Sequence, residues 1–506
     1  MGSEPKTNTF LSYLVEELKE AWLHGFSLQS VKQGRTATFC LALLAVACDI
    51  PACRKVCGFL GHAANRGCSE CWKLFPGQVG QKDYSGFARD AWPQRTHERH
   101  LEWCAQILDK KTKQDVKLLE REYGVRYSVL LELPYFDIVQ VHVIDPMHNL
   151  FLGTAKHVIE IWKEQGILTD KDMKSIQEKI DDFEVPSDLG RIPNKIQSSF
   201  TADQWKNWTL YFSIPCLTGI LPSQHLEIWK LFVKACYLLC SYVMTHEMLV
   251  EADPELITFC KMFEEKYGSD YVTPNMHLHG HIKECIIGYG PVYAFWLFSF
   301  ERYNGILGNE PSNQRSVELQ FMRRFLKDGL FFGQVLEVAQ GEETLANHLN
   351  MMQDPPSRGS LQDMMVSDLL DVCRISSRFI CIREVNMSLT NLISYIKKTI
   401  CHHQELSAGQ ILFFIEHNLL FHDGTIKKHI LGRVQWYLEM EPVFKDYYGF
   451  PVSVFYPNIY RQENSASFIP VQRIKCKIVR KTETLKRHHL TGQALITVPR
   501  DNFAGV

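Results

Sequence analysis

The stretch TATFCLALLAVACD at residues 36–49 decides the fold class that the sequence predicts. Its apolar part runs unbroken from Phe39 to Cys48 and stops at Asp49, well below the roughly 18 residues that a membrane-spanning helix needs. Such a run is typical of a strand buried on both faces. An aspartate that ends a buried strand holds its carboxylate at the sheet edge where α/β folds commonly form their sites.

Composition places the chain among globular proteins. It has 506 residues, of which 45% are hydrophobic and 22% charged, so we expect two to four domains. The formal net charge of -2 does not favour a nucleic-acid binder. No signal peptide precedes the 16 scattered cysteines, which predicts an intracellular, non-membrane protein with reduced thiols and allows a metal site.

The sequence pattern divides the chain into five parts. Residues 8–24 predict an amphipathic helix, residues 50–96 are rich in Gly, Pro, Cys and His, residues 97–265 are mainly helical, and the last hundred residues alternate as short strands do. We therefore expect a partial core carrying Asp49 at residues 1–96 and a helical insertion at 97–271. A histidine-rich segment (272–350) would return to the core, and a linker (351–360) would lead to a C-terminal region (361–506) ending in a β-rich module.

Two cysteines offer the first metal ligands. Cys68 and Cys71 are separated by two residues, the spacing with which two thiolates grip one tetrahedral zinc ion. Two buried thiols in a loop are the alternative explanation, because free cysteines often fill cores.

Three histidines lie in one short stretch, Thr-Pro-Asn-Met-His-Leu-His-Gly-His at residues 273–281. On a helix, which Pro274 could begin, His277 and His281 would share a face, whereas on a strand His279 would join them. Three histidines this close favour a metal role, and two of them would complete a site with two thiolates.

Two further motifs contain acidic residues. Glu301 lies in the aromatic run GPVYAFWLFSFERYNG (290–305), where burial would penalise a lone carboxylate unless it is paired or bound to a cation. A surface pair with Arg302 is the alternative. Asp145 precedes His148 by three residues at the start of a helical stretch, DPMHN, where an aspartate could simply be an N-cap.

Taken in order, these motifs resemble CACTA/EnSpm-type DDE transposases over roughly residues 40–330. The spacing is also similar to that of the V(D)J recombinase catalytic subunit, with an Asp, a Cys-x-x-Cys, a histidine pair and then a Glu. The resemblance implies an α/β fold with an incomplete RNase H-like core, a large and mainly α-helical insertion, and a small β-rich C-terminal module.

The resemblance also implies roles for individual residues. Asp49 and Glu301 would be catalytic carboxylates for Mg²⁺ or Mn²⁺ in two-metal phosphoryl transfer. The structural zinc ligands would be Cys68, Cys71, His277 and His281, with His279 as a substitute ligand if the stretch is extended. DNA at transposon ends would be the partner, the nucleus the location, and a homo-oligomer an allowed state.

The sequence departs from the family in one respect. The first catalytic aspartate should lie on an earlier strand, yet residues 1–48 contain no aspartate. We therefore expect an N-terminally truncated, transposase-derived chain that is inactive as it stands. The alternatives are a domesticated, non-enzymatic zinc-stabilised protein that binds DNA or protein, and a metal-dependent hydrolase that uses the His-x-His-x-His run alone.

One local stretch is basic. Residues 471–490 carry seven basic residues against Glu483, a net charge of seven minus one, or +6. A basic ribbon could contact phosphates without reading sequence, and a solvated edge strand is the alternative. The candidate nucleic-acid-binding residues are Arg473, Lys475, Lys477, Arg480, Lys481, Lys486 and Arg487.

Overall fold

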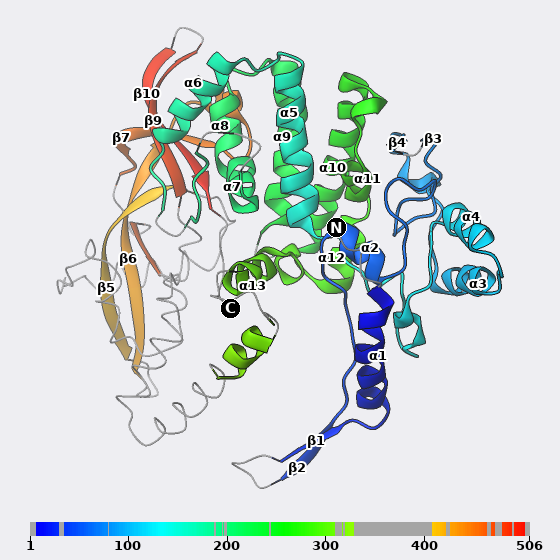
Figure 1. Cartoon of the computed structure of the whole chain (residues 1–506). Helices are drawn as coiled ribbons and strands as arrows, with labels where there is room; N and C mark the ends of the chain where they lie inside the picture. The colour runs from blue at the N-terminus through cyan, green and yellow to red at the C-terminus, as the bar shows by residue number, and fades with distance from the viewer. Residues whose placement is uncertain are drawn as a thin grey trace.

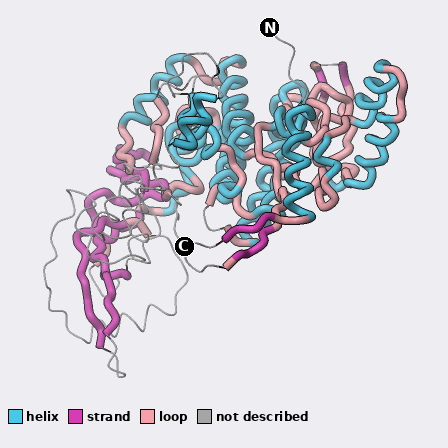
Figure 2. Tube along the Cα trace, turned by 60° about the horizontal axis from the view of Figure 1, so that its bottom comes forward, coloured by secondary structure: helices cyan, strands magenta, loops and turns pink. Residues whose placement is uncertain are grey.

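The protein has a mixed α/β structure in which a helical body precedes a C-terminal β-sheet (Figures 1 and 2). The computed structural model describes residues 7–29, 35–78, 80–186, 189–194, 196, 200–241, 244–308, 316, 319–327, 407–420, 426–462, 467–470, 478–487 and 490–500. None of the helices within these ranges is long and apolar enough to cross a membrane. The expected linker at 351–360 lies outside the described residues.

An N-terminal arm projects from the helical body (Figure 1). We use this name for α1, Thr7–Leu23, together with the antiparallel hairpin of β1, Phe26–Gln29, and β2, Thr36–Phe39. One face of α1 packs through the buried Val15 on the 3-10 turn Val129–Glu132, whereas both strands of the hairpin are exposed throughout. The amphipathic helix predicted for residues 8–24 is confirmed.

The prediction of a buried strand over residues 36–49 is wrong. Strand β2 ends at Phe39, and Leu44 farther along is 74% exposed. A parallel bridge joins Val46 to His142, with the Val46 nitrogen donating to the Val141 oxygen at 2.7 Å. It is the one parallel contact among the described residues, so the apolar run has no sheet to bury it on both sides. An apolar run alone does not reveal whether neighbouring strands exist.

The region predicted to be mainly helical is helical. Its helices are α3 His97–Leu108, α4 Lys113–Tyr123, α5 Lys156–Glu164, α6 Asp170–Asp181, α7 Ala202–Asn207, α8 Ser213–Leu217, α9 Ser223–Leu239 and α10 His246–Tyr267. One further helix, α2 Ile50–Val56, precedes this region. Two π-helical segments, Met147–Ala155 and Trp208–Phe212, run directly into α5 and α8. The core of this body is rich in fully buried aromatic rings, among them Trp162, Trp205, Trp208 and Trp229.

Short elements connect this body to the candidate site. They are the strands β3 Gly77–Gln78 and β4 Gln81–Lys82, the 3-10 turns Arg89–Ala91, Ser269–Tyr271 and Val292–Ala294, and the helices α11 Pro274–His279, α12 Ile282–Tyr289 and α13 Phe298–Gly308. Residues 319–327 are also helical. Of the two settings considered for Glu301, the buried one does not occur, because no residue of α13 is buried and Phe300 and Tyr303 are exposed.

The β-rich C-terminal module is confirmed. Its sheet is antiparallel in the order β5-β6-β7-β10-β9, with β8 paired to β6. The elements are β5 Gly409–Leu420, β6 Ile426–Glu439, α17 Pro442–Tyr448, β7 Ser453–Tyr460, β8 Phe468–Pro470, β9 Ile478–Arg487 and β10 Leu490–Pro499. The Tyr237 hydroxyl donates to the Pro499 carbonyl at 2.7 Å and so ties the sheet to α9.

Candidate metal centre and carboxylate site

Two thiols and two imidazoles from distant parts of the chain converge in the interior. Cys68 and Cys71 lie in the loop between α2 and α3, and His277 and His281 lie at the junction of α11 and α12. One ligand atom from each residue lies within 4.8 Å of the others, and all four residues are buried. It is the one group of three or more such donors to converge within the described ranges. The group could bind a metal ion such as zinc.

Backbone amides prepare the Cys68 thiol to act as a ligand. Its sulfur accepts hydrogen bonds from the amides of Glu70 at 3.3 Å and Cys71 at 3.4 Å. Burial alone would raise the pKa of Cys68, but the hydrogen bond from Cys71 and the charges of His277 and His281 hold that pKa well below its ordinary value. The hydrogen bond to Cys68 raises the pKa of Cys71. As the pH increases, Cys68 therefore becomes a thiolate before Cys71 does.

The imidazoles face the thiols. Nε2 of His277 lies 3.3 Å from the Cys71 sulfur. Nε2 of His281 is buried and has no hydrogen-bond partner in the described part of the protein. A buried ring nitrogen without a partner loses its hydration, so a metal ion at this point would satisfy it. The set Cys₂His₂ suits tetrahedral zinc with no open coordination position.

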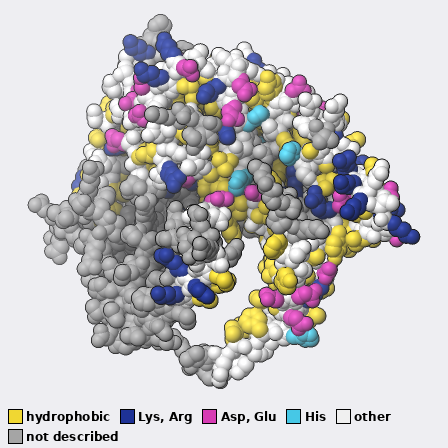
Figure 3. Space-filling view, in the orientation of Figure 1, with side chains coloured by type: hydrophobic (Ala, Val, Ile, Leu, Met, Phe, Trp, Pro, Cys, Tyr) yellow, Lys and Arg dark blue, Asp and Glu magenta, His cyan; other side chains and the backbone are white. Residues whose placement is uncertain are grey.

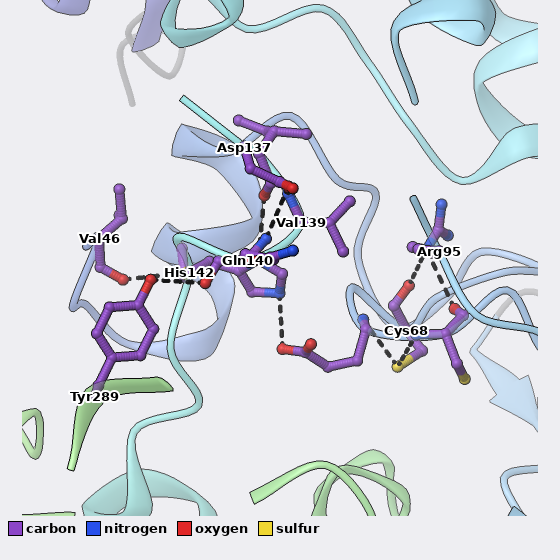
Figure 4. A network of polar contacts seen from close by, with 12 residues as sticks. Val46, Cys68, Arg95, Asp137, Val139, Gln140, His142 and Tyr289 are labelled. Atoms are coloured by element: carbon purple, nitrogen blue, oxygen red, sulfur yellow. Dashed lines mark hydrogen bonds and ion pairs between the residues drawn. The ribbon is translucent and has the colours of Figure 1, made fainter. Parts of the chain in front are cut away.

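Aromatic rings and a buried guanidinium enclose the centre. The rings of Phe75 and Trp92 lie 4.9 Å and 4.2 Å from the His277 ring, measured between centroids. Arg95 donates from Nε to the carbonyls of Cys68 and Cys71 at 2.9 Å and 3.1 Å, as Figure 4 shows. This packing excludes water and fixes the Cys-x-x-Cys loop, as a closed structural site requires.

The histidine stretch is two short helices and not one. Thr273 caps α11 by accepting from the Met276 amide, and Pro274 occupies the first turn, as the sequence predicts. The helix ends at His279, so His277 and His281 do not lie on one continuous helix, although both reach the centre as the sequence predicts. Gly280 permits the turn, because a Cβ at this position would lie 2.6 Å from the Trp92 ring.

His279 is not part of the centre. Its Nε2 lies 3.0 Å from the Thr154 hydroxyl and its Nδ1 lies 3.4 Å from the Cys260 sulfur. Burial lowers the pKa of His279 to about 3, so it is a neutral core residue. The substitute ligand is therefore turned away from the thiols, and the three histidines do not assemble the site that a hydrolase based on this run would need.

A second set of polar groups surrounds His148. The sequence motif is compatible with Asp145 as a simple N-cap, but in the structure Asp145 accepts more hydrogen bonds than an N-cap does. Its carboxylate is fully buried and accepts from the amides of Met147, His148 and Leu297 at 3.2, 2.9 and 2.9 Å. It also lies 2.5 Å from Nδ1 of His148. Each oxygen thus has two partners, which leaves no lone pair for a metal ion.

Asp49 and Glu301, the two expected catalytic carboxylates, both lie near this imidazole. The Asp145 hydrogen bond raises the pKa of His148, and the charges of Asp49 and Glu301 raise it further. Asp49 caps α2, with one oxygen accepting from the Ala52 amide at 2.7 Å, and Glu301 is exposed on α13. Residues 252 positions apart in the sequence therefore share one neighbourhood. They and His148 do not form a convergent ligand group of the Cys₂His₂ kind.

A buried ion pair connects the two neighbourhoods. Nε2 of His142, the residue bridged to Val46, lies 2.9 Å from the carboxylate of Glu70 inside the Cys-x-x-Cys loop. Figure 4 shows this contact beside Cys68 and Arg95. Three residues after His142 the chain reaches Asp145, so the metal centre is tied directly to the segment that positions His148.

The candidate nucleic-acid-binding residues differ in their settings. Arg480 bonds Glu184 at 2.6 Å, and Lys481 is buried between Asp182 and Glu483 at 3.3 Å from each. Those two cations attach the sheet to the end of α6, whereas Lys486 is exposed. The remaining candidates, Arg473, Lys475, Lys477 and the side chain of Arg487, lie outside the described residues.

No protein-family model matches the chain, and no curated protein matches it.

Proposed function

We propose that this chain is a transposase-derived protein of the CACTA/EnSpm type, held together by a structural zinc ion and descended from an enzyme that cleaves and joins DNA strands. The observation that carries the proposal is the convergence of the thiol pair and the histidine pair in one buried centre. The charges of Asp49 and Glu301 both raise the pKa of His148, although the three side chains do not form a convergent ligand group.

Parallel pairing of the Val46 and His142 segments supports a remnant of an RNase H-like sheet. The carboxyl ends of parallel neighbours lie at the same edge, which agrees with Asp49 and Asp145 lying in one neighbourhood. In this proposal the zinc clamp fastens the helical insertion to that edge. Such a protein would work on DNA in the nucleus.

The chemistry of the carboxylates defines what the site can do. Asp49 and Glu301 would hold a divalent cation such as Mg²⁺ or Mn²⁺, which stabilises charge on a phosphate during strand cleavage. Asp49 keeps one oxygen beyond its helix cap, and Glu301 is accessible. Asp145 cannot serve as a third ligand, because its oxygens are occupied. These residues therefore suit one cation better than two.

Manganese binding tests the proposal. Free Mn²⁺ measured by electron paramagnetic resonance should reveal one weak site in the wild-type protein. Asp49→Asn and Glu301→Gln should each abolish that site, and asparagine can still cap α2, so the fold is retained. Glu17→Gln, which removes an exposed carboxylate from the arm, is the matched control. Binding that survives both site variants would refute the carboxylate assignment.

A non-enzymatic protein that keeps the zinc-stabilised scaffold is the second candidate. The full occupation of Asp145 favours it, since no third carboxylate ligand is identified among the described residues around His148. Retained zinc together with absent Mn²⁺ binding would support this candidate over a DNA-cleaving one.

A further inference from the structure

Arg54 is a buried cation without a partner. It lies in the last turn of α2, and only 5% of the residue is exposed. Its Nε is fully buried and has no hydrogen-bond partner, and no ion pair to Arg54 occurs in the described part of the chain. Burial of an uncompensated guanidinium is costly, because the charge loses its hydration. A cation in this setting therefore needs an anion beside it.

Arg95 shows how the same interior satisfies another buried arginine. Arg95 is also 5% exposed, yet its Nε donates to two carbonyls of the Cys-x-x-Cys loop. Its terminal nitrogens donate to the carbonyls of Tyr123 and Arg66 at 3.3 and 3.0 Å. Arg54 makes no such bond to the described residues. Its donors are therefore left for a ligand from outside the chain.

The charged groups around Arg54 do not neutralise it. Burial lowers the pKa of Arg95 to about 10, and the charge of Arg54 contributes to that decrease. Burial also lowers the pKa of His62, and the charge of Arg54 lowers it further. Glu70 in the Cys-x-x-Cys loop is already paired with His142 at 2.9 Å. Arg54 thus disfavours positive charge on its neighbours, and no carboxylate of the described residues is bonded to it.

The loop of residues 61–67 places an accessible imidazole near Arg54. The hydroxyl of the buried Tyr84 donates to the His62 carbonyl at 2.7 Å, and a Cβ at Gly67 would lie 2.5 Å from the same hydroxyl. The loop is therefore packed tightly on Tyr84. The charge of Arg54 reaches this ring too, since it opposes the increase that burial gives to the pKa of Tyr84. His62 itself is exposed, so solvent reaches the group from its side.

We propose that Arg54 and His62 bind a small oxyanion of the phosphate class, either orthophosphate or a terminal phosphate monoester. The planar guanidinium matches two oxygens of a phosphate group, and the imidazole can donate a further hydrogen bond. Because only 5% of Arg54 is exposed, a compact anion fits better than the internal phosphodiester of a nucleic-acid strand. The proposal does not rest on the proposed function, since it uses neither the metal ligands nor the carboxylates near His148.

Isothermal titration calorimetry with orthophosphate tests the site, on full-length protein dialysed free of phosphate. The wild-type protein should bind one orthophosphate per chain. Arg54→Gln should weaken binding at least about tenfold, since a hydrogen bond to a charged group contributes a factor of about that size. His62→Gln should weaken it by a smaller factor, and because His62 is exposed this variant tests the site even if Arg54→Gln does not fold. Arg99→Gln makes the same substitution at an exposed arginine of α3 and is the matched control, with binding unchanged.

Thermal unfolding gives a second readout that a purely structural arginine would not give. Without phosphate, Arg54→Gln should unfold at the wild-type temperature or above it, because the substitution removes an uncompensated buried charge. With saturating orthophosphate, the wild-type protein should be the more stable of the two.

Competition experiments identify the source of the phosphate group. Displacement of orthophosphate by thymidine monophosphate would show that the site accepts a monoester, and its absence would restrict the site to orthophosphate. A thymidine oligonucleotide without terminal phosphates should not compete. Wild-type protein that binds no orthophosphate would overturn the proposal. So would binding that survives both Arg54→Gln and His62→Gln, or equal competition by the oligonucleotide.

Discussion

The Cys68→Ser variant tests the metal centre most directly. Serine keeps the shape of the side chain but is a poor zinc ligand, and the site lowers the pKa of Cys68 whereas it raises that of Cys71. We expect wild-type protein to contain one zinc ion per chain by inductively coupled plasma mass spectrometry. The variant should retain less than a tenth of that amount.

The size of the stability loss follows from binding of the metal to the folded chain alone. Cys71 and His277 are 206 positions apart, so the ligand set exists only when the chain is folded. Free zinc at about a thousandfold excess over its dissociation constant then stabilises the fold by about 4 kcal/mol. At about 2 °C per kcal/mol for a domain of this size, the melting temperature of the helical body should fall on the order of 10 °C. Chelation of the wild-type protein should give a similar decrease.

Cys104→Ser separates metal loss from the loss of any buried thiol. Cys104 is buried in α3 outside the ligand group. Its serine variant should keep full zinc content and lose only about 1 to 2 kcal/mol, the usual effect of a small polar substitution in a core. His279→Ala should also retain zinc. A wild-type protein without stoichiometric zinc, or a Cys68→Ser variant with unchanged zinc and melting temperature, would refute the assignment.

Three further outcomes are expected. Burial and the charge of Arg95 lower the pKa of His100 to about 3, so only the unfolded chain gains this proton as the pH falls below 6.5. Stability should therefore decrease by about 1.4 kcal/mol per pH unit from pH 6.5 towards 3, and His100→Leu should remove that contribution in urea unfolding curves. Arg89→Ala should destabilise the protein by about 2 kcal/mol in the same assay, because it breaks the Arg89 Nη2 to Asp253 bond of 2.7 Å and leaves the buried carboxylate with Lys283 at 3.6 Å. The chain alone should not nick DNA carrying the cognate element ends with Mg²⁺ or Mn²⁺, and nicking that disappears in Glu301→Gln would show that another residue completes the metal site.

The metal ligands could be predicted from sequence because their signal is local. Two residues between Cys68 and Cys71, and three between His277 and His281, bring donors together over one or two turns of chain. The local sequence does not decide whether His279 or His281 is the metal ligand. Gly280 packs closely on the Trp92 ring, a distant residue that no local pattern reveals, and only His281 reaches the thiols, whereas His279 lies against Thr154.

The long-range pairing could not be predicted in the same way. Residues 36–49 have the composition of a buried strand, but burial depends on neighbours that the run does not specify. Asp145 stood in a recognisable DPMHN motif, yet its full set of bonds includes the Leu297 amide, 152 positions away. The local motif explains the bonds of Asp145 to the amides that follow it. It does not predict that an amide from a distant part of the chain also donates to the same carboxylate.

The Leu297 bond explains how the exposed Glu301 is placed near His148. Asp145 holds the amide of Leu297, and the carbonyl of Leu297 in turn accepts from the Glu301 amide at 2.9 Å, one helical turn later. The position of α13 is therefore fixed at its start by the same carboxylate that orients the imidazole. The candidate metal centre lies at the other end of α12 from this contact, so the α12 segment is anchored at both ends. An exposed helix with no buried residue can be positioned in this way through its backbone, without a hydrophobic core of its own.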